Sequence, residues 1–232
     1  PRKVLVVMQF TFAIVLSICA IMVHRQIDYA MNRDAGFERG GVVYNFTQGE
    51  VPKHFEGIRN ELLGSGAAVG VTRTYSPITY IWSTSNGFSW PGSTEEDKTT
   101  KNFLQFGSDV DFVKTFGATI KQGRDLDVHT YRSDTAAMLL NEKAVEMMDL
   151  KDAIGTEIKN LNGQTFHVVG VVKDFIVGSP YQAIEPMMIN GWTERYGAVH
   201  FRLNPALSQG EALLRAERVF KKYNPEYPFE YA

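Results

Sequence analysis

The sequence predicts an α+β protein in which one long apolar helix precedes a mixed α/β domain. Three observations lead to this fold class. The chain opens with twenty residues that carry no charge, Val4 to Val23. Beyond them, segments with strand-like alternation and segments with helix-like spacing of apolar residues follow one another, with Gly and Pro between them. No internal repeat is detectable.

The run from Val4 to Val23 predicts a transmembrane helix. Twenty helical residues span about 30 Å, the thickness of the hydrocarbon core of a bilayer, whereas buried helices and signal-peptide segments are usually shorter. A cleavable signal peptide and a lipoprotein signal ending at Cys19 are the alternatives. The first lacks a small-x-small cleavage site, and the second has the bulky Ile18 before the cysteine. A buried core helix would have to be apolar on every side.

The helix is expected to continue beyond the membrane as a stalk. Its apolar periodicity persists through Ile27, Ala30 and Met31, and Gly36 is the first residue that favours a stop. Lys and Arg are equally frequent at the two ends of the apolar run, so the positive-inside rule does not orient it. Because over 200 residues of domain follow the run, we expect the N-terminus in the cytoplasm and the remainder outside.

The first half of the domain begins with a strand and an amphipathic helix. Phe55, Ile58 and Leu62 recur at helical spacing before the glycines at 64 and 66. The elements predicted here are a strand at 42–46, a helix at 51–63, a strand at 67–75 and an irregular, aromatic loop at 78–101.

The second half of the domain has clearer signals for where its helices and strands begin and end. Its last helix has the clearest signal, because Ser208 precedes Glu211 by three residues in a capping pattern and an apolar stripe follows from Ala212 to Tyr223. The other elements predicted are strands at 103–106, 136–141, 166–172 and 198–203, a strand followed by a turn at 119–127, and helices at 109–117 and 142–148.

The order of these elements predicts two subdomains after the helix. Residues 1–35 form the transmembrane and stalk helix, and residues 36–232 form the domain. A split βαβ-type, porter-like unit is expected at about 36–90 and 180–232, and a smaller β-rich subdomain is expected to be inserted at about 91–179.

Composition and motifs exclude several functions. The formal net charge of −2 lacks the basic footprint of a nucleic-acid-binding protein. Cys19 is the single cysteine and lies in the apolar run, so neither a disulfide framework nor a CxxC metal site is possible. The segments GSGAAVG (64–70), GFSWP (87–91) and HFE (54–56) miss the dinucleotide loop, the nucleophile elbow and the zinc deaminase site respectively.

One cluster merits a metal hypothesis. His129 lies beside Asp125 and Asp127, but calcium and zinc sites need more ligands at defined offsets, so an exposed acidic turn is the better interpretation. His167 and His200 fall within predicted strands and are expected to be packing residues. We therefore predict no catalytic, cofactor-binding or metal-binding residues.

Several short motifs, in order, resemble one protein family. RKVLVVMQFTFAIVLSI, RQIDYAMNRDAGFER, DVDFVKTFGATIKQGRDL, LLNEKAVEMMDLKDAIGTEI and FHVVGVVKDF with the later IEPMMI are similar to the second half of a MacB/FtsX-type permease of an ABC transporter. The resemblance runs from Arg2 to about Ile189. It implies a transmembrane helix followed by a MacB-like periplasmic core domain, within a longer permease.

The resemblance also implies a function, a location and partners. It implies a component without enzyme activity that couples cytoplasmic ATP hydrolysis to periplasmic movement, for export or mechanotransmission. The location would be the inner (cytoplasmic) membrane, with residues after about 24 in the periplasm. The partners would be an ABC ATPase subunit on the cytoplasmic side, a second permease half or a homodimer partner, and a periplasmic adaptor.

Residues that recur in the family have structural interpretations here. Arg124 is expected to pair with a carboxylate at a turn, Asn141 to cap the helix at 142–148, Gly155 to occupy a tight turn, and Asp174 to cap a turn after a strand.

A second hypothesis stays open. The chain could be a single-span sensor or binding module that captures a ligand between its subdomains, with Trp82, Trp90 and Trp192 lining a cleft. A single span with a cytoplasmic signalling domain would favour this alternative, whereas further spans and an ATPase partner would favour the permease.

Overall fold

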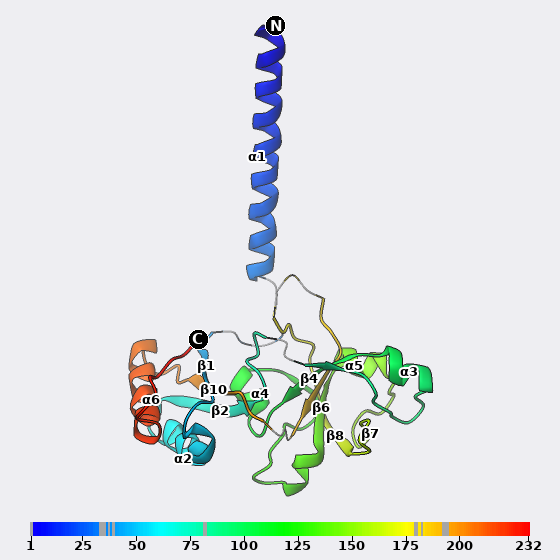
Figure 1. The fold of residues 1–232 in the computed structure, drawn as a ribbon, viewed down its shortest axis with the longest axis vertical. Coiled ribbons are helices and arrows are strands. Elements are labelled where there is room, and N and C mark those ends of the chain that lie inside the picture. The colour runs from blue at the N-terminus through cyan, green and yellow to red at the C-terminus, as the bar shows by residue number, and fades with distance from the viewer. Residues whose placement is uncertain are drawn as a thin grey trace. The chain divides into compact units, whose positions relative to one another are not determined.

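A computed structural model describes most of the chain. The described residues are 2–32, 36, 38, 40–80, 83–178, 181, 183–191 and 195–232. They divide into two compact units, Pro1–Asp34 and Ala35–Ala232. The first unit is helical and the second is a mixed α/β domain (Figure 1). The predicted fold class is therefore confirmed.

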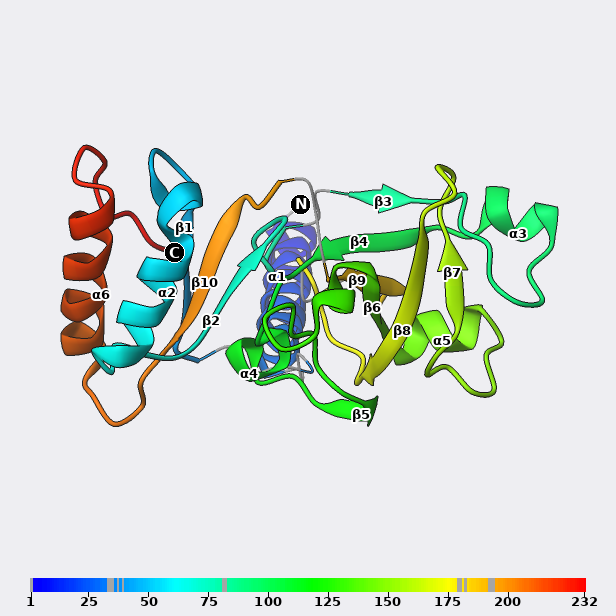
Figure 2. The ribbon, with the colours of Figure 1, turned by 90° about the horizontal axis from the view of Figure 1, so that it is seen from below.

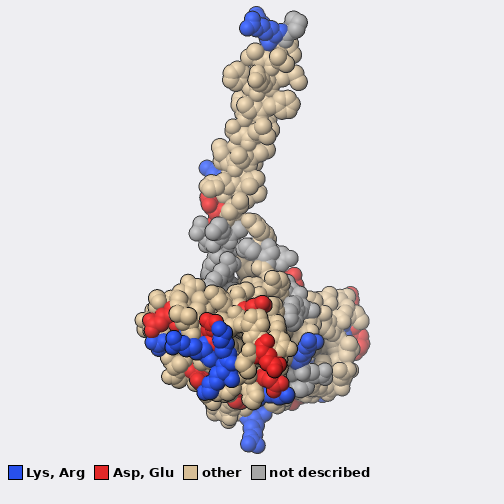
Figure 3. Space-filling model, turned by 60° about the vertical axis from the view of Figure 1, so that its left-hand side comes forward, with Lys and Arg blue, Asp and Glu red and all other residues tan. Residues whose placement is uncertain are grey.

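The first unit is the helix α1 (Arg2–Asn32), which is long and apolar enough to cross a membrane. Charged side chains lie near its two ends, with none between them (Figure 3). The two hydroxyl groups within its apolar run are satisfied by the helix, since Thr11 donates to the carbonyl of Val7 and Ser17 to that of Ala13. Such bonds let polar side chains lie in an apolar solvent.

The domain contains a three-stranded antiparallel sheet of strands far apart in the sequence. Its strands are β1 (Val42–Phe46), β10 (Ala198–Leu203) and β2 (Ala68–Thr74), in that order. The helices α2 (Val51–Gly64) and α6 (Gln209–Tyr223) lie beside each other and cover it (Figure 2).

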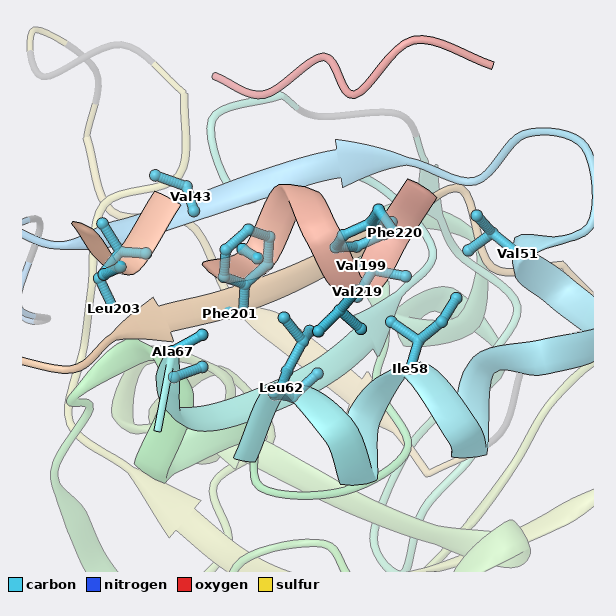
Figure 4. Close-up of a cluster of buried hydrophobic side chains, with 14 of the residues drawn as sticks. Val43, Val51, Ile58, Leu62, Ala67, Val199, Phe201, Leu203, Val219 and Phe220 are labelled. Carbon is cyan, nitrogen blue, oxygen red and sulfur yellow. The ribbon is translucent and has the colours of Figure 1, made fainter. Parts of the chain in front are cut away.

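The core between these helices and the sheet consists of the apolar side chains that recur at helical spacing in α2 and α6. Ile58 and Leu62 of α2 face Phe201 of β10, and Val219 and Phe220 of α6 close the cluster (Figure 4). Ser208 caps α6 by accepting a hydrogen bond from the backbone N–H of Glu211, as predicted. This packing, rather than helix propensity alone, stabilises both helices.

The second sheet has seven strands. Its order is β3-β4-β9-β6-β8-β5, and β7 pairs with β8 outside this path. The bounds are β3 (Thr84–Ser85), β4 (Phe103–Gly107), β5 (Ile120–Gly123), β6 (Ala137–Asn141), β7 (Glu157–Lys159), β8 (Thr165–Val172) and β9 (Met187–Asn190).

This sheet is buried on both faces. Along β6, Leu139 belongs to one hydrophobic cluster, whereas Met138 and Leu140 belong to another. Successive side chains of a strand point to opposite faces, so the two clusters cover opposite sides of the sheet. Central strands of this kind read as continuous apolar runs, which is why the segment AMLLN was recognisable.

Short helical segments surround the second sheet. They are α3 (Glu95–Thr100), α4 (Phe112–Phe116), the 3₁₀ helix Arg132–Ala136 and α5 (Glu142–Met147). The predicted loop at 78–101 was wrong in part, because it contains β3 and α3. α3 begins with a capping box, which was not predicted, in which the Thr94 and Asp97 side chains each accept a hydrogen bond from a backbone N–H.

The subdomain boundaries at about 91 and 179 stay a prediction. Strands of the seven-stranded sheet come from residues 84–190, and those of the three-stranded sheet from residues 42–74 and 198–203.

Asn141 joins α5 to the second sheet. Its Oδ1 accepts hydrogen bonds from the backbone N–H groups of Ala144, at 2.9 Å, and Met187, at 2.8 Å. Its Nδ2 donates to the carbonyl of Glu185 at 2.8 Å. The predicted helix cap is confirmed, and this fully buried side chain also fixes the start of β9.

Asn141→Ala is expected to lower the free energy of unfolding by about 2–3 kcal/mol, because it leaves two buried backbone N–H groups and one backbone carbonyl without their hydrogen-bond partner. The measurement is urea unfolding of the full chain in detergent, followed by tryptophan fluorescence. Ser208→Ala is the matched control, since it removes an exposed cap with one bond and should cost about 1 kcal/mol. Equal losses in the two variants would contradict the cross-strand role of Asn141.

Candidate functional site at the junction of the two sheets

The two sheets meet where β2 and β4 end. Thr74 forms an isolated bridge with Ser108, and the N–H of Tyr75 donates to the carbonyl of Gly107 at 2.9 Å. The following segment, Ser108 to Gly117, includes α4 and packs on β2 and β10. We call this contact the junction: residues 108–117 together with the parts of α2, β2 and β10 that they touch.

A glycine allows the close approach. A Cβ added to Gly70 of β2 would lie 3.0 Å from the Cα and 3.0 Å from the Oγ1 of Thr115. That is tighter than ordinary van der Waals contact, so the backbone of α4 rests on β2 at a point where a side chain would push it away.

Asp109 is the buried centre of the junction. Its Oδ1 accepts from the hydroxyl of Thr72 at 3.1 Å and from the N–H groups of Arg73, at 2.9 Å, and Val110, at 2.8 Å. Its Oδ2 accepts from Nε of Arg73 at 2.8 Å. The Asp109 side chain is only 1% exposed, and four donors around one carboxylate offset the cost of burying its charge.

The Arg73 side chain is held from both sides. Its guanidinium lies over the ring of Phe55, at 4.1 Å, and over the ring of Tyr196, at 4.4 Å. Phe55 comes from α2 and Tyr196 precedes β10, so the stack holds the guanidinium in line with Asp109.

Two further arginines reach the same segment. Arg59 of α2 pairs with Asp111 at 2.6 Å, and Nε of Arg202 in β10 donates to the carbonyl of Thr115 at 2.8 Å. Arg202 also pairs with Glu38 at 2.9 Å, and burial lowers the pKa of its guanidinium. Three arginines of the three-stranded layer thus bind the segment that leads out of the second sheet.

His200 lies under the junction. It is fully buried, and its ring lies 4.9 Å from that of Phe116 and 5.3 Å from that of Tyr44. Its Nε2 accepts from the N–H of Ile78 at 3.4 Å. The proton therefore sits on Nδ1, which donates to Thr74 Oγ1 at 3.0 Å, and that hydroxyl donates to the carbonyl of Ser76. Burial lowers the pKa of His200 to about 3, so this packing residue is neutral, as its position in a strand predicted.

The carboxylates of the candidate metal cluster, Asp125 and Asp127, accept hydrogen bonds from backbone N–H groups. Asp125 Oδ2 accepts from the N–H of Val113, and Asp127 Oδ1 accepts from the N–H groups of His129 and Thr130. The predicted exposed turn was wrong for both carboxylates, because Asp125 and Asp127 are partly buried, and burial raises the pKa of Asp125 to about 6. Among the described residues, no group of three His, Cys, Asp or Glu could hold a metal ion.

Arg124 pairs with a carboxylate, as predicted, and that carboxylate belongs to Asp134. The guanidinium donates to both carboxylate oxygens, at 2.6 and 2.7 Å, and these hydrogen bonds raise the pKa of Arg124. Asp174 caps a helix rather than a turn, since its Oδ1 accepts from the N–H of Lys143 in the first turn of α5.

The tryptophan cleft of the alternative hypothesis is not assembled by the described residues. Trp90 is buried in the second sheet's core, and its indole N–H donates to the carbonyl of Met148 at 3.0 Å. Trp82 and Trp192 lie outside the described residues.

The junction escaped the sequence analysis because its partners are far apart. Asp109 lies 36 residues from Arg73, and Arg202 lies 87 residues from Thr115. The available signal was Asp109 itself, a charged residue that follows Ser108 and begins the segment DVDFV. It was interpreted as the start of a helix, which in fact begins at Phe112.

Two solved structures are similar to this chain. The periplasmic region of MacB from Actinobacillus actinomycetemcomitans superimposes with a TM-score of 0.56 at 16% identity, covering 88% of this chain and 92% of that one. The extracellular domain of the noncanonic ABC-type transporter YknZ from Gram-positive bacteria gives a TM-score of 0.54 at 16% identity, covering 82% and 97%. These likenesses show a shared fold.

Sequence comparison identifies the family. No curated protein sequence matches the chain. The family model of the MacB-like periplasmic core domain, however, matches residues 12–217, which span part of α1 and nearly all of the domain. The resemblance noted in the motifs is confirmed, and the chain belongs to the family of MacB-like periplasmic core domains.

Proposed function

We propose that this chain is the membrane helix and extracytoplasmic domain of an ABC transporter permease, and that it couples cytoplasmic ATP hydrolysis to periplasmic conformational change in export or mechanotransmission. It carries out no catalytic step of its own. It lies in the inner membrane with residues after about 24 in the periplasm. It works with an ATPase subunit on the cytoplasmic side, with a second permease half or homodimer partner, and with a periplasmic adaptor.

The observation that carries this proposal is the continuity of α1. The helix runs for 31 residues without Gly or Pro, a length of about 46 Å at 1.5 Å per residue. A bilayer core takes about 30 Å of that length, so several turns extend beyond it. A continuous helix resists bending because its backbone hydrogen bonds are intact, and it can therefore transmit tilt or rotation.

Within the domain, Gly36 provides a point where such movement enters. It has a φ of +77°, and a Cβ added to it would lie 2.1 Å from the carbonyl oxygen of Asp174 and 2.8 Å from Cβ of Phe175. The backbone at Gly36 therefore lies directly against the segment that follows β8, and Asp174 in turn caps α5. A displacement at Gly36 acts on the second sheet through these contacts.

The junction supports the same proposal. Asp109 and the three arginines tie residues 108–117 to α2, β2 and β10. Buried, hydrogen-bonded ion pairs are costly to separate, because each would leave an uncompensated charge. The two sheets are therefore suited to move together when force reaches one of them.

The test is Ile27→Pro in the full-length permease, with Ile27→Ala as the matched control. Ile27 lies beyond the apolar run, and proline there removes one helix hydrogen bond and clashes with the preceding turn, at a cost of about 3 kcal/mol. The readouts are co-purification of an ATPase, its rate of ATP hydrolysis, and ATP-dependent hydrogen exchange in residues 40–178.

We expect both variants to retain the ATPase and the exchange pattern of the nucleotide-free domain. Only Ile27→Pro should lose the ATP-dependent change in exchange. A proline variant that responds to ATP like the alanine variant would refute transmission through α1. If no ATPase co-purifies with the unmodified protein, the permease function fails and the single-span sensor replaces it.

A further inference from the structure

The second sheet carries an asparagine–glycine pair at the tip of a hairpin. β7 and β8 are antiparallel neighbours (Figure 2), and residues 160–164 join them. Asn162 and Gly163 lie in this turn, and both are exposed. The backbone nitrogen that follows an asparagine can attack the side-chain amide, and glycine allows the approach most readily because it has no side chain. The pair is therefore a candidate for chemical modification without an enzyme.

The chain contains three asparagine–glycine pairs, at 86–87, 162–163 and 190–191. Attack requires the glycine N–H to leave its hydrogen bond and the backbone to rotate towards the asparagine side chain. The surroundings of each glycine decide how easily this movement occurs. The three pairs therefore differ in reactivity if their surroundings differ.

The pair at 190–191 is locked into the sheet. Gly191 is buried, and its N–H donates to the carbonyl of Ala137 at 2.8 Å. A Cβ added to Gly191 would overlap the carbonyl oxygen of Asp134. Nδ2 of Asn190 also donates to Oε1 of Gln105 at 3.3 Å. Rotation here requires the centre of the sheet to open, which costs a free energy close to that of global unfolding.

The pair at 86–87 is held by a separate helix. Gly87 is buried, and its N–H donates to the carbonyl of Lys98 at 2.7 Å. Nδ2 of Asn86 donates to the carbonyl of Thr99 at 3.0 Å. Both acceptors belong to α3, and a Cβ added to Gly87 would overlap the side chain of Leu161. This pair cannot rotate unless α3 moves away.

The pair at 162–163 is held by its own turn. The N–H of Gly163 donates to the carbonyl of Asn160 at 3.0 Å, and the Asn162 side chain makes no hydrogen bond to the described residues. A Cβ added to Gly163 would meet no atom within 4 Å, so the space beside the reacting nitrogen is open. Water can replace the single exposed hydrogen bond, and turns of this kind open by local fluctuation.

We propose that Asn162 is a site of spontaneous deamidation. The nitrogen of Gly163 forms a bond to Cγ of Asn162, the bond from Cγ to Nδ2 breaks, and ammonia leaves with the proton of the Gly163 N–H. The product is a five-membered succinimide. Water then adds to either carbonyl carbon of the ring and breaks its bond to the ring nitrogen, which regains a proton. The residue becomes aspartate or isoaspartate, and nothing is oxidised or reduced.

Conversion changes the tip of the hairpin. Either product places a negative charge where Asn162 is neutral, and isoaspartate also adds a methylene group to the backbone. The longer backbone moves the N–H of Gly163 away from the carbonyl of Asn160. β8 itself is held by β5, β6 and β7, so the change is confined to the turn. The inference is independent of coupling to an ATPase.

The test is incubation of the full chain in detergent at mildly alkaline pH, followed by digestion and mass spectrometry of the peptides that contain the three pairs. We expect Asn162 to convert at least about tenfold faster than Asn86 or Asn190, a difference of about 1.4 kcal/mol in barrier. Fragmentation that distinguishes the two products should find isoaspartate, which forms only through the ring. Conversion of Asn86 or Asn190 as fast as that of Asn162, or absence of isoaspartate at position 162, would overturn the proposal.

The unfolded chain separates the effect of the structure from that of the local sequence. In concentrated urea all three pairs lose their restraints, so we expect them to convert at similar rates. If Asn162 keeps its tenfold advantage there, flanking residues set the ranking and the structural assignment is refuted.

Asn162→Gln is the matched variant. Glutamine would have to close a larger, six-membered ring, so we expect no conversion at this position in the folded chain. The variant should unfold at the same urea concentration as the unmodified protein, because the Asn162 side chain makes no hydrogen bond to the described residues. Continued release of ammonia from the turn peptide of this variant would refute attack on the Asn162 side chain.

Discussion

Asp109→Ala is expected to lower the free energy of unfolding by about 4 kcal/mol, because it breaks a buried ion pair. The carboxylate accepts four hydrogen bonds and is 1% exposed. Its removal leaves the Arg73 guanidinium without its anion and strands the N–H of Val110. Urea unfolding of the full chain in detergent, followed by tryptophan fluorescence, measures the loss.

Asp152→Ala is the matched control. Asp152 is exposed, and its replacement should change the free energy of unfolding by less than about 0.5 kcal/mol. Asp109→Asn should remain strongly destabilised, because the amide directs an N–H₂ group at Arg73 Nε where an acceptor is needed. If Asp109→Ala unfolds at the same urea concentration as Asp152→Ala, the junction does not stabilise the domain.

Hydrogen exchange in Asp109→Ala tests whether the junction makes the two sheets move together, separately from its effect on stability. If the junction makes the two sheets move together, Asp109→Ala should raise hydrogen exchange in β2 and in residues 108–117 before it raises exchange in β8. Exchange that rises uniformly over both sheets would mean that the variant unfolds globally and that the junction is no separate unit.

Local patterns explain what the sequence could predict. The helix at 51–63 was recognisable because Phe55, Ile58 and Leu62 form one stripe, and the observed α2 ends one residue later. The strand at 166–172 was recognisable from its β-branched run and became β8. The cap at Asn141 was recognisable because a polar residue separated a buried strand from a helix.

What could not be predicted depends on contacts distant in sequence. The pairing of β4 with β9 joins residues more than 80 apart, and the order of strands in the second sheet does not follow the chain. The segment at 78–101 was interpreted as a loop because its elements are short. β3 has two residues, and α3 is held by its capping box rather than by an apolar face.

The candidate site shows the same division. Arg124 could be expected to find a carboxylate at a turn, and Asp134 lies only ten residues away. Asp109 could not be matched with Arg73, because nothing in either segment indicates that β2 and the end of β4 lie together. Buried charges are the residues for which sequence reasoning fails first, since their partners come from tertiary structure.

Acidification is expected to destabilise the domain through His200. Burial lowers its pKa from the ordinary 6.5 to about 3 in the folded state. Between these values the unfolded chain binds a proton that the folded chain does not, so the free energy of unfolding falls as the pH falls. The slope approaches about 1.4 kcal/mol per pH unit, which gives a loss of about 3 kcal/mol between pH 7 and pH 4.

Other ionisable groups also affect how the free energy of unfolding depends on pH. Tyr44, whose ring contacts His200, stays neutral in this range because burial raises its pKa. Asp125 acts in the opposite sense, since its pKa is raised to about 6. Its stabilising contribution is fully present below its ordinary pKa of 3.8 and is lost as the pH rises through 6. The unmodified protein therefore shows the sum of two opposed contributions.

His200→Asn isolates the histidine. The variant lacks the titrating ring but keeps Asp125, so the difference in free energy of unfolding between the two proteins reports His200 alone. Loss of packing lowers the stability of the variant at every pH, but that loss does not depend on pH. We expect the unmodified protein to lose its advantage over the variant by about 3 kcal/mol from pH 7 to pH 4. A difference that stays constant over this range would mean that His200 is not held neutral, and that the chain of bonds through Thr74 and Ser76 does not fix its proton.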